Sequence, residues 1–464
     1  MINKRLKRLA QRPVYFAFIL ASFIFFSGCS KFQSESWAQA PLNRLAKPAP
    51  PICRGETAPY QMKFEIRDES SPANLKQFLL QQSNFRDSLT AMSLRQNSYL
   101  TPTKRVPLEQ WPELLDDLNF AEMPLAIDRQ IAHYQQINLS GYIRLGNDVY
   151  PLAQAEKSLE VFKYLIEKDL ACTVGHTYQY CLQRFNSEVR AQFNLYEPSL
   201  DPGDPRYGEP DDALFTGYYT PDISVSRIKT AIYNHAIYAM PATDSLRQSS
   251  RDLIDFHNRL AGQHLSLFYA SDLFSVYLAQ IQGNAHVFIQ GAEHPASFYL
   301  NYSGTNGLRW RFISEYMYRM HYINNTSIHA QHQFLREHPN KQEQIYSTCP
   351  SYVYFEKTTS PPIGSGDVPV TANRTIATDE NYYPFKGLLA FVQAQRPTAK
   401  QNLNTPCPAI QFQNFSRFFI DQDSGGAIRG KARADIYFGE GSYARLAAYN
   451  EDTRGNIYFL MLKK

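Results

Sequence analysis

The chain has 464 residues, 44% of them hydrophobic, and a mean hydropathy of −0.42, which indicates a soluble globular protein long enough for two domains. Its formal net charge of +4 includes five basic residues within positions 1–12, so the rest of the chain carries 4 − 5 = −1. A chain without a basic stripe lacks the electrostatic attraction that nucleic-acid binding needs, and we predict no nucleic-acid partner.

The N-terminus has the pattern of a bacterial lipoprotein signal. Basic residues in 1–12 are followed by an apolar stretch, 13–26, and then by small residues ahead of Cys29. An uncleaved transmembrane anchor is the alternative, but the apolar stretch is shorter than the roughly 20 residues that a spanning helix needs. We therefore predict a signal peptide over 1–29, with Cys29 as the acylated first residue of the mature chain.

The residues after the signal predict a tether and then a folded body. Ser30, in place of an aspartate, follows the cysteine and resembles sorting to the outer membrane, so we expect a lipid-anchored protein on the periplasmic face. Residues 30–59 are polar and rich in proline, which predicts a linker. Apolar residues at helical spacing over 74–89 and 155–170 then predict two amphipathic helices that cover a core.

Five cysteines follow Cys29, an odd number in an oxidising compartment. Cys172 and Cys181 flank a short polar segment and are candidates for a disulfide, as are Cys349 and Cys407. Sequence spacing does not fix the pairing, and one thiol is left over. No Cys-x-x-Cys, His-Glu-x-x-His or Gly-x-Ser-x-Gly pattern is present, so we predict no metal site and no cofactor.

The middle and the end of the chain are rich in strand patterns. Residues 215–221 predict a strand, and Gly217 inside it marks a bulge or a close approach of the backbone to a ligand. Short strand-like runs over 223–349 predict a second β domain. Further short strands between 368 and 462, joined by glycine and proline turns, predict a small closed barrel.

A pair of carboxylates lies within this last region. Asp423 and Asp435 are 435 − 423 = 12 positions apart, with Gly425 and Gly426 after the first and the apolar run 436–438 after the second. This pattern predicts strand, tight turn, strand. A carboxylate at the start of a buried strand is partly desolvated, which raises its pKa and suits a general acid. The alternative is a structural turn in which the aspartates bond to local backbone N–H groups.

Several of these stretches, in the same order, resemble the membrane-bound lytic murein transglycosylase A family over roughly residues 205–464. Its C-terminal module is known for three aspartates, and Asp379 matches the first of them. The resemblance implies a mainly β protein with an α-rich N-terminal part. It further implies a double-psi β-barrel built from 60–222 and 350–464, a smaller β domain over 223–349 inserted into it, and a groove between the two.

The family cleaves the β-1,4 bond between MurNAc and GlcNAc of peptidoglycan without water and leaves a 1,6-anhydromuramoyl end. The resemblance implies that Asp435 is the single general acid and base and that Asp423 supports it as a like charge or a polar contact. We expect Asp379 to be structural and to cap a turn. The other matched positions are expected to bind the glycan; they are Thr216, Gly217, Tyr218, Tyr219, Gln280, Gln282, Gly283, Gly425 and Gly426.

The chain departs from the family pattern directly after Gly283. The family more often continues with small residues and a basic one, whereas this chain has Asn284, Ala285 and His286. We expect His286 to be a surface histidine or one with satisfied hydrogen bonds.

Two other functions are open. A murein-binding lipoprotein would have the glycan site without the acid. Asp423, Ser424 and Gly425 also resemble an aspartic-protease triplet, although such enzymes need two triplets and this chain has one. The partners expected are peptidoglycan glycan strands and, through the lipid anchor, the outer membrane.

Overall fold

The computed structural model describes residues 98–199, 212–290, 296–398, 411–425 and 428–464. The predicted signal with Cys29, the linker over 30–59, the helix over 74–89 and Gly426 lie outside the described residues. Within the described ranges no helix combines the length and the apolar character needed to cross a membrane.

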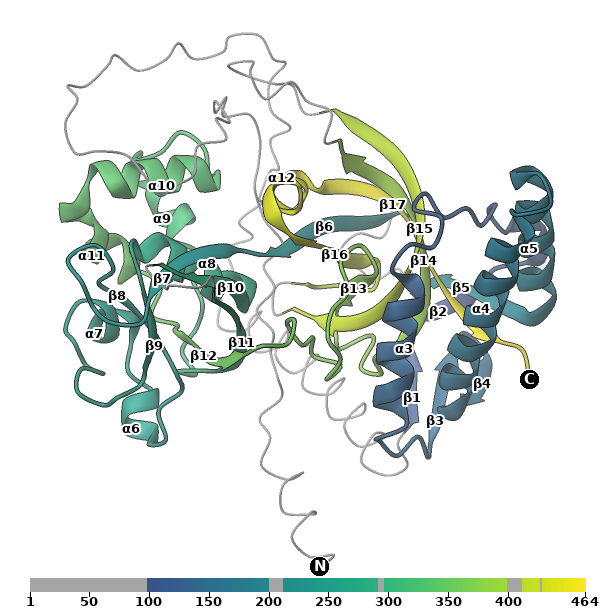
Figure 1. Ribbon diagram of the computed structural model, residues 1–464, viewed down its shortest axis with the longest axis horizontal. Helices are drawn as coiled ribbons and strands as arrows, with labels where there is room; N and C mark the ends of the chain where they lie inside the picture. Colours follow the sequence, from purple (N-terminus) through teal and green to yellow (C-terminus); the bar gives the residue numbers. More distant parts are fainter. Residues whose placement is uncertain (1–97, 200–211, 291–295, 399–410, 426–427) are drawn as a thin grey trace, which may run out of the picture.

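A six-stranded barrel forms the centre of the molecule (Figure 1). Its strands are β6 (Ala213–Thr220), β13 (Thr375–Thr378), β14 (Leu388–Pro397), β15 (Phe412–Ser424), β16 (Arg433–Glu440) and β17 (Asp452–Leu462). They pair in the order β14, β15, β13, β16, β6 and β17, and β17 pairs back with β14, so the barrel is closed. The pairs β13–β15 and β6–β16 are parallel and the others are antiparallel. The expected double-psi β-barrel is confirmed.

An α-rich layer covers one side of the barrel, on the right of Figure 1. It comprises β1 (Ser98–Thr101), β2 (Thr103–Arg105), η2 (Leu108–Gln110), α3 (Met123–Tyr134), β3 (Tyr142–Leu145), β4 (Asp148–Pro151), α4 (Ala153–Cys172), α5 (Tyr178–Gln192) and β5 (Phe193–Pro198). The helix predicted over 155–170 is α4, and its apolar residues Leu159, Phe162 and Ile166 are fully buried in the core shared with the barrel. β5 and β2 extend the barrel sheet beyond β17.

A second β domain is inserted between β6 and β13, on the left of Figure 1. Its sheet has the order β12 (Val353–Thr358), β11 (Ser297–Thr305), β10 (Asn284–Ile289), β7 (Asp222–Ser226), β9 (Ser266–Ala270) and β8 (His235–Tyr238). Its helices are α6 (Asp244–Arg247), α7 (Arg251–Asp255), α8 (Leu273–Gln282), α9 (Ile313–Arg319), α10 (Ile328–Glu337), η3 (Pro339–Lys341) and α11 (Gln342–Tyr346). Since β12 is an edge strand of this sheet, the inserted domain extends to Thr358 rather than to the predicted boundary at 349.

The described part of the chain contains one disulfide and one free thiol. Cys172 at the end of α4 forms a disulfide with Cys181 in α5, with Cα atoms 5.8 Å apart, which confirms the first candidate pair. Cys349 is a buried free thiol. Cys349 lies in the core of the inserted domain, and Cys407, its candidate partner, lies outside the described residues.

Candidate active site

Four neighbouring barrel strands place the predicted acids in one row. In the registers of these strands, Asp423 on β15 lies opposite Ala377 on β13, Ala377 lies opposite Asp435 on β16, and Asp435 lies opposite Thr216 on β6. Residues in register on adjacent strands project from the same face of a sheet, and strands lie about 4.8 Å apart. The backbones of the two aspartates are therefore two strand spacings apart, about 10 Å, on the same face.

Asp435 is fully buried, with 0% of its surface exposed, and its two oxygens have different surroundings. The hydroxyl of Thr216 donates a hydrogen bond to Oδ1. Arg433 Nη2 lies 3.5 Å from the same oxygen and donates to the Thr216 hydroxyl at 3.0 Å. Oδ2 has no hydrogen-bond partner among the described residues. Burial raises the pKa of the Asp435 carboxyl, and the Arg433 charge and the Thr216 bond offset part of that rise.

Both carboxylate oxygens of Asp423 accept hydrogen bonds. Oδ2 accepts a hydrogen bond from the Tyr218 hydroxyl at 2.9 Å, and Oδ1 accepts from the backbone N–H groups of Ser365 at 2.9 Å and Ser424 at 2.8 Å. Burial raises the pKa of Asp423 to about 6, against the effect of these donors. The support expected of Asp423 for Asp435, as a like charge or through a polar contact, stays a prediction.

Two of the predicted sugar contacts on β6 face away from this row. A Cβ atom on Gly217 would lie 2.5 Å from the ring of Phe438 and 3.0 Å from the backbone of α12 (Gly441–Asn450). The Tyr219 hydroxyl bonds to the Tyr449 hydroxyl on α12 at 2.7 Å. Because side chains alternate along a strand, these residues pack under α12. We therefore revise the role predicted for them: packing explains Gly217 and Tyr219.

The predicted contacts on the inserted domain lie at the end of α8. Gln280 and Gln282 are buried, and neither amide atom of Gln280 has a hydrogen-bond partner among the described residues. Gln282 Oε1 accepts from the Tyr219 N–H at 3.4 Å, across the boundary between the domains. Gly283 ends α8 with φ = 71°, a left-handed conformation that favours glycine. Buried amides without partners are groups that a ligand or an ordered water can satisfy.

Asp379 and Gly425 shape the turns around the row. Asp379 Oδ1 accepts from the backbone N–H of Asn381 at 3.1 Å and from its side chain at 2.7 Å, while Oδ2 accepts from the Gly430 N–H at 2.9 Å. These bonds connect the turn after β13 to the loop between β15 and β16. Gly425 follows β15, and its carbonyl accepts from the Ile428 N–H at 3.0 Å.

Sequence reasoning missed Arg433, although a signal for it was present. Arg433, Asp435 and Tyr437 are two positions apart along β16, so the strand period places them on one face. The Tyr437 hydroxyl bonds to Thr220 Oγ1 at 2.7 Å, and its ring centroid lies 5.0 Å from that of Tyr218. Arg433 and Tyr437 thus belong to the surroundings of the two aspartates.

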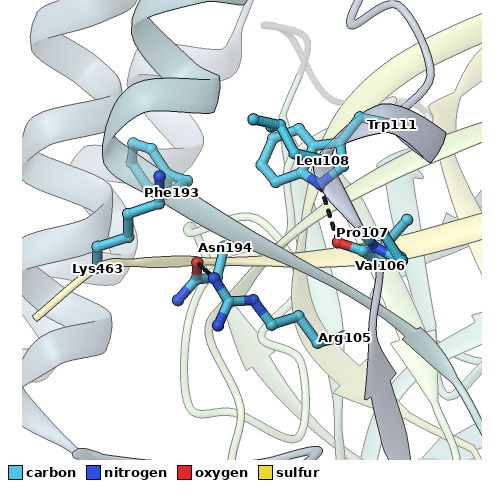
Figure 2. Close-up of a pocket in the computed structure, with 8 residues that line it drawn as sticks. All are labelled: Arg105, Val106, Pro107, Leu108, Trp111, Phe193, Asn194 and Lys463. Carbon is cyan, nitrogen blue, oxygen red and sulfur yellow. Dashed lines mark hydrogen bonds between the residues drawn. The ribbon is translucent and has the colours of Figure 1, made fainter.

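A cavity of about 350 Å³ lies elsewhere, between η2, β5 and the end of the chain (Figure 2). It is lined by Arg105, Val106, Pro107, Leu108, Trp111, Phe193, Asn194 and Lys463. Figure 2 shows Arg105 reaching across to Asn194, a hydrogen bond of 2.6 Å. None of these residues belongs to the row of aspartates, so the candidate site rests on that row and not on this cavity.

Comparison with protein families matches both parts of this architecture. Residues 214–356 match the MltA specific insert domain, and residues 374–461 match the 3D domain. The first match covers the inserted sheet and the second covers the barrel strands with the three aspartates. Fold and site therefore define a 3D-domain protein with an inserted β domain.

Known proteins with similar sequences identify the class more closely. The chain is 23% identical to membrane-bound lytic murein transglycosylase A of Vibrio cholerae over 289 residues, which are 61% of this chain and 74% of that protein. It is 27% identical to the Escherichia coli protein of the same name over 243 residues, which are 51% of this chain and 62% of that protein. With the two domain matches, the chain belongs to the membrane-bound lytic murein transglycosylase A family.

Solved structures show the same fold. A membrane-bound lytic murein transglycosylase from Agrobacterium tumefaciens has a TM-score of 0.57 and 20% identity, covering 78% of this chain and 97% of that one. Escherichia coli MltA with bound chitohexaose has a TM-score of 0.56 and 22% identity, covering 78% and 95%. At these identities the likeness concerns the fold, and it agrees with a barrel and a smaller inserted β domain.

Proposed function

We propose that the protein is a lytic transglycosylase that cleaves the β-1,4 bond between MurNAc and GlcNAc of peptidoglycan and forms a 1,6-anhydromuramoyl end. The observation that carries the proposal is Asp435, a buried carboxyl with a raised pKa and one oxygen, Oδ2, free of protein partners in the described structure. Such a carboxyl keeps its proton at higher pH than an exposed aspartate. Family membership supplies the substrate class.

The reaction needs one group that first gives and then takes a proton. Asp435 donates its proton to the glycosidic oxygen as the bond from C1 to that oxygen breaks. The C6 hydroxyl of the same MurNAc ring attacks C1, and its proton passes to the Asp435 carboxylate. Because the nucleophile is part of the substrate, the reaction needs no second carboxylate to activate water. The two products together contain all the atoms of the substrate, so the reaction needs no cofactor and consumes no water.

The groups around Asp435 have separate tasks in this proposal. Thr216 and Arg433 bind Oδ1 and so fix the orientation of the carboxyl, which leaves Oδ2 to carry the proton. Asp423 on β15 positions Tyr218 through its hydrogen bond, and Tyr218 lies on β6, the strand next to that of Asp435. Since Asp435 has no exposed surface, substrate binding must displace the atoms that cover Oδ2.

The alternatives are less well supported. A non-catalytic murein-binding protein has no need for a buried acid with an unpartnered oxygen. An aspartic protease needs two aspartates that share a proton. Asp423 instead binds Tyr218 and two backbone N–H groups, and Asp435 lies about two strand spacings from it.

We also propose that the mature chain is held on the periplasmic face of the outer membrane by lipid on Cys29. The signal-like pattern over 1–29 supports this location. The test is fractionation of cells that express the chain or Cys29→Ala. The chain should be found with the outer membrane and Cys29→Ala should not; equal membrane association of both would exclude the lipid anchor.

The test of the activity is digestion of purified sacculi followed by mass spectrometry of the soluble fragments. Anhydro-muropeptides, each lighter by one water than the hydrolysed fragment, are the expected product. Reducing-end sugars without anhydro ends would indicate hydrolysis, peptide fragments would indicate a protease, and no release would indicate a binding protein.

The position of Arg433 predicts a change in pH dependence. Activity should decline as pH rises through the raised pKa of Asp435, because the general acid loses its proton. Arg433→Gln removes the charge that lowers the pKa of Asp435, so the alkaline limb of the kcat profile should shift to higher pH. Arg429→Gln is the matched control, since that side chain is 55% exposed on the preceding loop. An unchanged limb in Arg433→Gln would show that Arg433 does not act on the acid.

A further inference from the structure

Three potential metal ligands meet where the inserted sheet joins the barrel. They are Asp222 on β7, His286 on β10 and Glu440 at the end of β16, and their ligand atoms all lie within 4.8 Å of one another. His286 Nδ1 is 2.9 Å from Glu440 Oε2 and 3.9 Å from Asp222 Oδ1. These separations are close to those between the ligands of one small divalent ion, whose bonds to nitrogen and oxygen are about 2.0–2.2 Å.

Strand register and backbone conformation place the three side chains together. Asp222 and His286 are register partners on adjacent parallel strands, so they project from the same face of the inserted sheet. Glu440 stands between Gly439 at φ = 92° and Gly441 at φ = 84°, a backbone path that favours glycine. Glu440 occupies the N-cap position of α12 but makes no capping hydrogen bond with its side chain. Its carboxylate is directed to His286 instead.

The imidazole ring of His286 is held in place by its neighbours. It stacks on Tyr299, its register partner on β11, with ring centroids 4.3 Å apart and planes 16° apart. A ring fixed by stacking on a neighbouring side chain matches the outer support that metal ligands have in proteins.

The three side chains are supported but can still be reached by an ion. The side chain of His286 is 15% exposed, that of Glu440 33% and that of Asp222 47%. An ion can therefore enter from solvent without a change in fold. The two carboxylates also supply charge that balances a divalent cation.

We propose that Asp222, His286 and Glu440 bind one divalent transition-metal ion, with Zn²⁺ as the best match, and that this ion locks the inserted domain to the barrel. One imidazole nitrogen and two carboxylate oxygens are ligands that Zn²⁺ accepts, and a water completes four-coordination. Two ligands come from the inserted sheet and one from the strand that carries Asp435, so the ion joins the two domains five positions along β16 from the proposed acid. The ion has a structural task and takes no part in the proposed reaction.

The test is titration of the purified, metal-free full-length chain with Zn²⁺ by calorimetry and with Co²⁺ by visible absorption. The chain should bind one ion more than His286→Gln or Glu440→Gln, which remove one ligand each. Tyr299→Ala should bind the ion about tenfold more weakly, because it removes the ring on which His286 stacks. Saturating Zn²⁺ should raise the unfolding temperature of the chain and leave that of His286→Gln unchanged.

Two matched variants serve as controls for the metal site. His257 lies 3.5 Å from Glu343 in an exposed pair of the same domain, so His257→Gln removes a histidine next to a single carboxylate and should bind the ion normally. Asp435→Asn should also bind it normally, which separates the metal site from the proposed activity. Equal stoichiometry and affinity in the chain and in His286→Gln, or no binding by the chain, would overturn the site.

Discussion

Asp435→Asn should lower the rate of anhydro-muropeptide release from sacculi by about a thousandfold or more. Asparagine keeps the size of the side chain and the acceptor oxygen that Thr216 binds, but it has no acidic proton to give to the glycosidic oxygen. A thousandfold loss corresponds to about 4 kcal/mol of transition-state stabilisation. The measurement is the initial rate of product release at equal concentrations of the chain and the variant, with the thermal unfolding of both recorded.

Asp423→Asn serves as the comparison on the same row. It weakens the hydrogen bonds with Tyr218, Ser365 and Ser424 but leaves the proposed acid intact, so we expect a decrease of about tenfold. If Asp435→Asn retained the wild-type rate, Asp435 would not be the acid. If Asp423→Asn alone abolished activity in a folded protein, the roles of the two aspartates would have to be exchanged.

Asp116→Ala should destabilise the protein by about 3–5 kcal/mol, because it leaves the charge of the buried Arg374 without its carboxylate partner. Arg374, directly before β13, donates to Asp116 through Nη1 at 2.6 Å and Nη2 at 2.9 Å, and both side chains are buried. Asp116 also accepts from the backbone N–H groups of Phe120 and Phe418. The pair therefore joins the α-rich layer to β13 and β15, two strands of the site. Chemical denaturation monitored by fluorescence gives the free energy of unfolding.

An exposed ion pair in the same layer is the matched control. Asp128 pairs with Lys163, but the Asp128 side chain is 55% exposed, so Asp128→Ala should change the free energy of unfolding by about 1 kcal/mol or less. A loss of stability in Asp116→Ala no larger than that in Asp128→Ala would show that the buried pair does not hold the layer to the barrel.

The strands of the barrel follow from local sequence, but their closure does not. The glycine pair between two apolar runs predicts the strand, turn and strand around Asp423 and Asp435, and β15 and β16 form there. The spacing of apolar residues likewise predicts α4. Closure depends on pairing β17 with β14 and β6 with β16 across long stretches of chain, which no local pattern encodes. The resemblance to a known family supplied that part.

Only some of the residues around the acid were predicted from the sequence. Several of their contacts depend on packing between elements that are far apart in the chain. Gly217 and Thr216 are neighbours in sequence, yet one packs under α12 and the other binds Asp435. Which face of β6 meets the aspartates depends on the register with β16, so sequence reasoning assigned both residues to the substrate. Arg433 could have been predicted from the two-residue period of β16, which places it on the same face as Asp435, but it was not. The contact of His286 with Glu440 joins residues 154 positions apart, beyond the reach of any spacing rule.

The central claim is that a hydroxyl of the substrate, and not water, attacks the sugar. Sacculi digested by the chain in water enriched with heavy oxygen test this directly, because mass spectrometry shows whether solvent oxygen enters the product. We expect anhydro-muropeptides that carry no heavy oxygen from the solvent. Fragments with one solvent oxygen at the new sugar end would contradict the account, since they require a water activated by a second group.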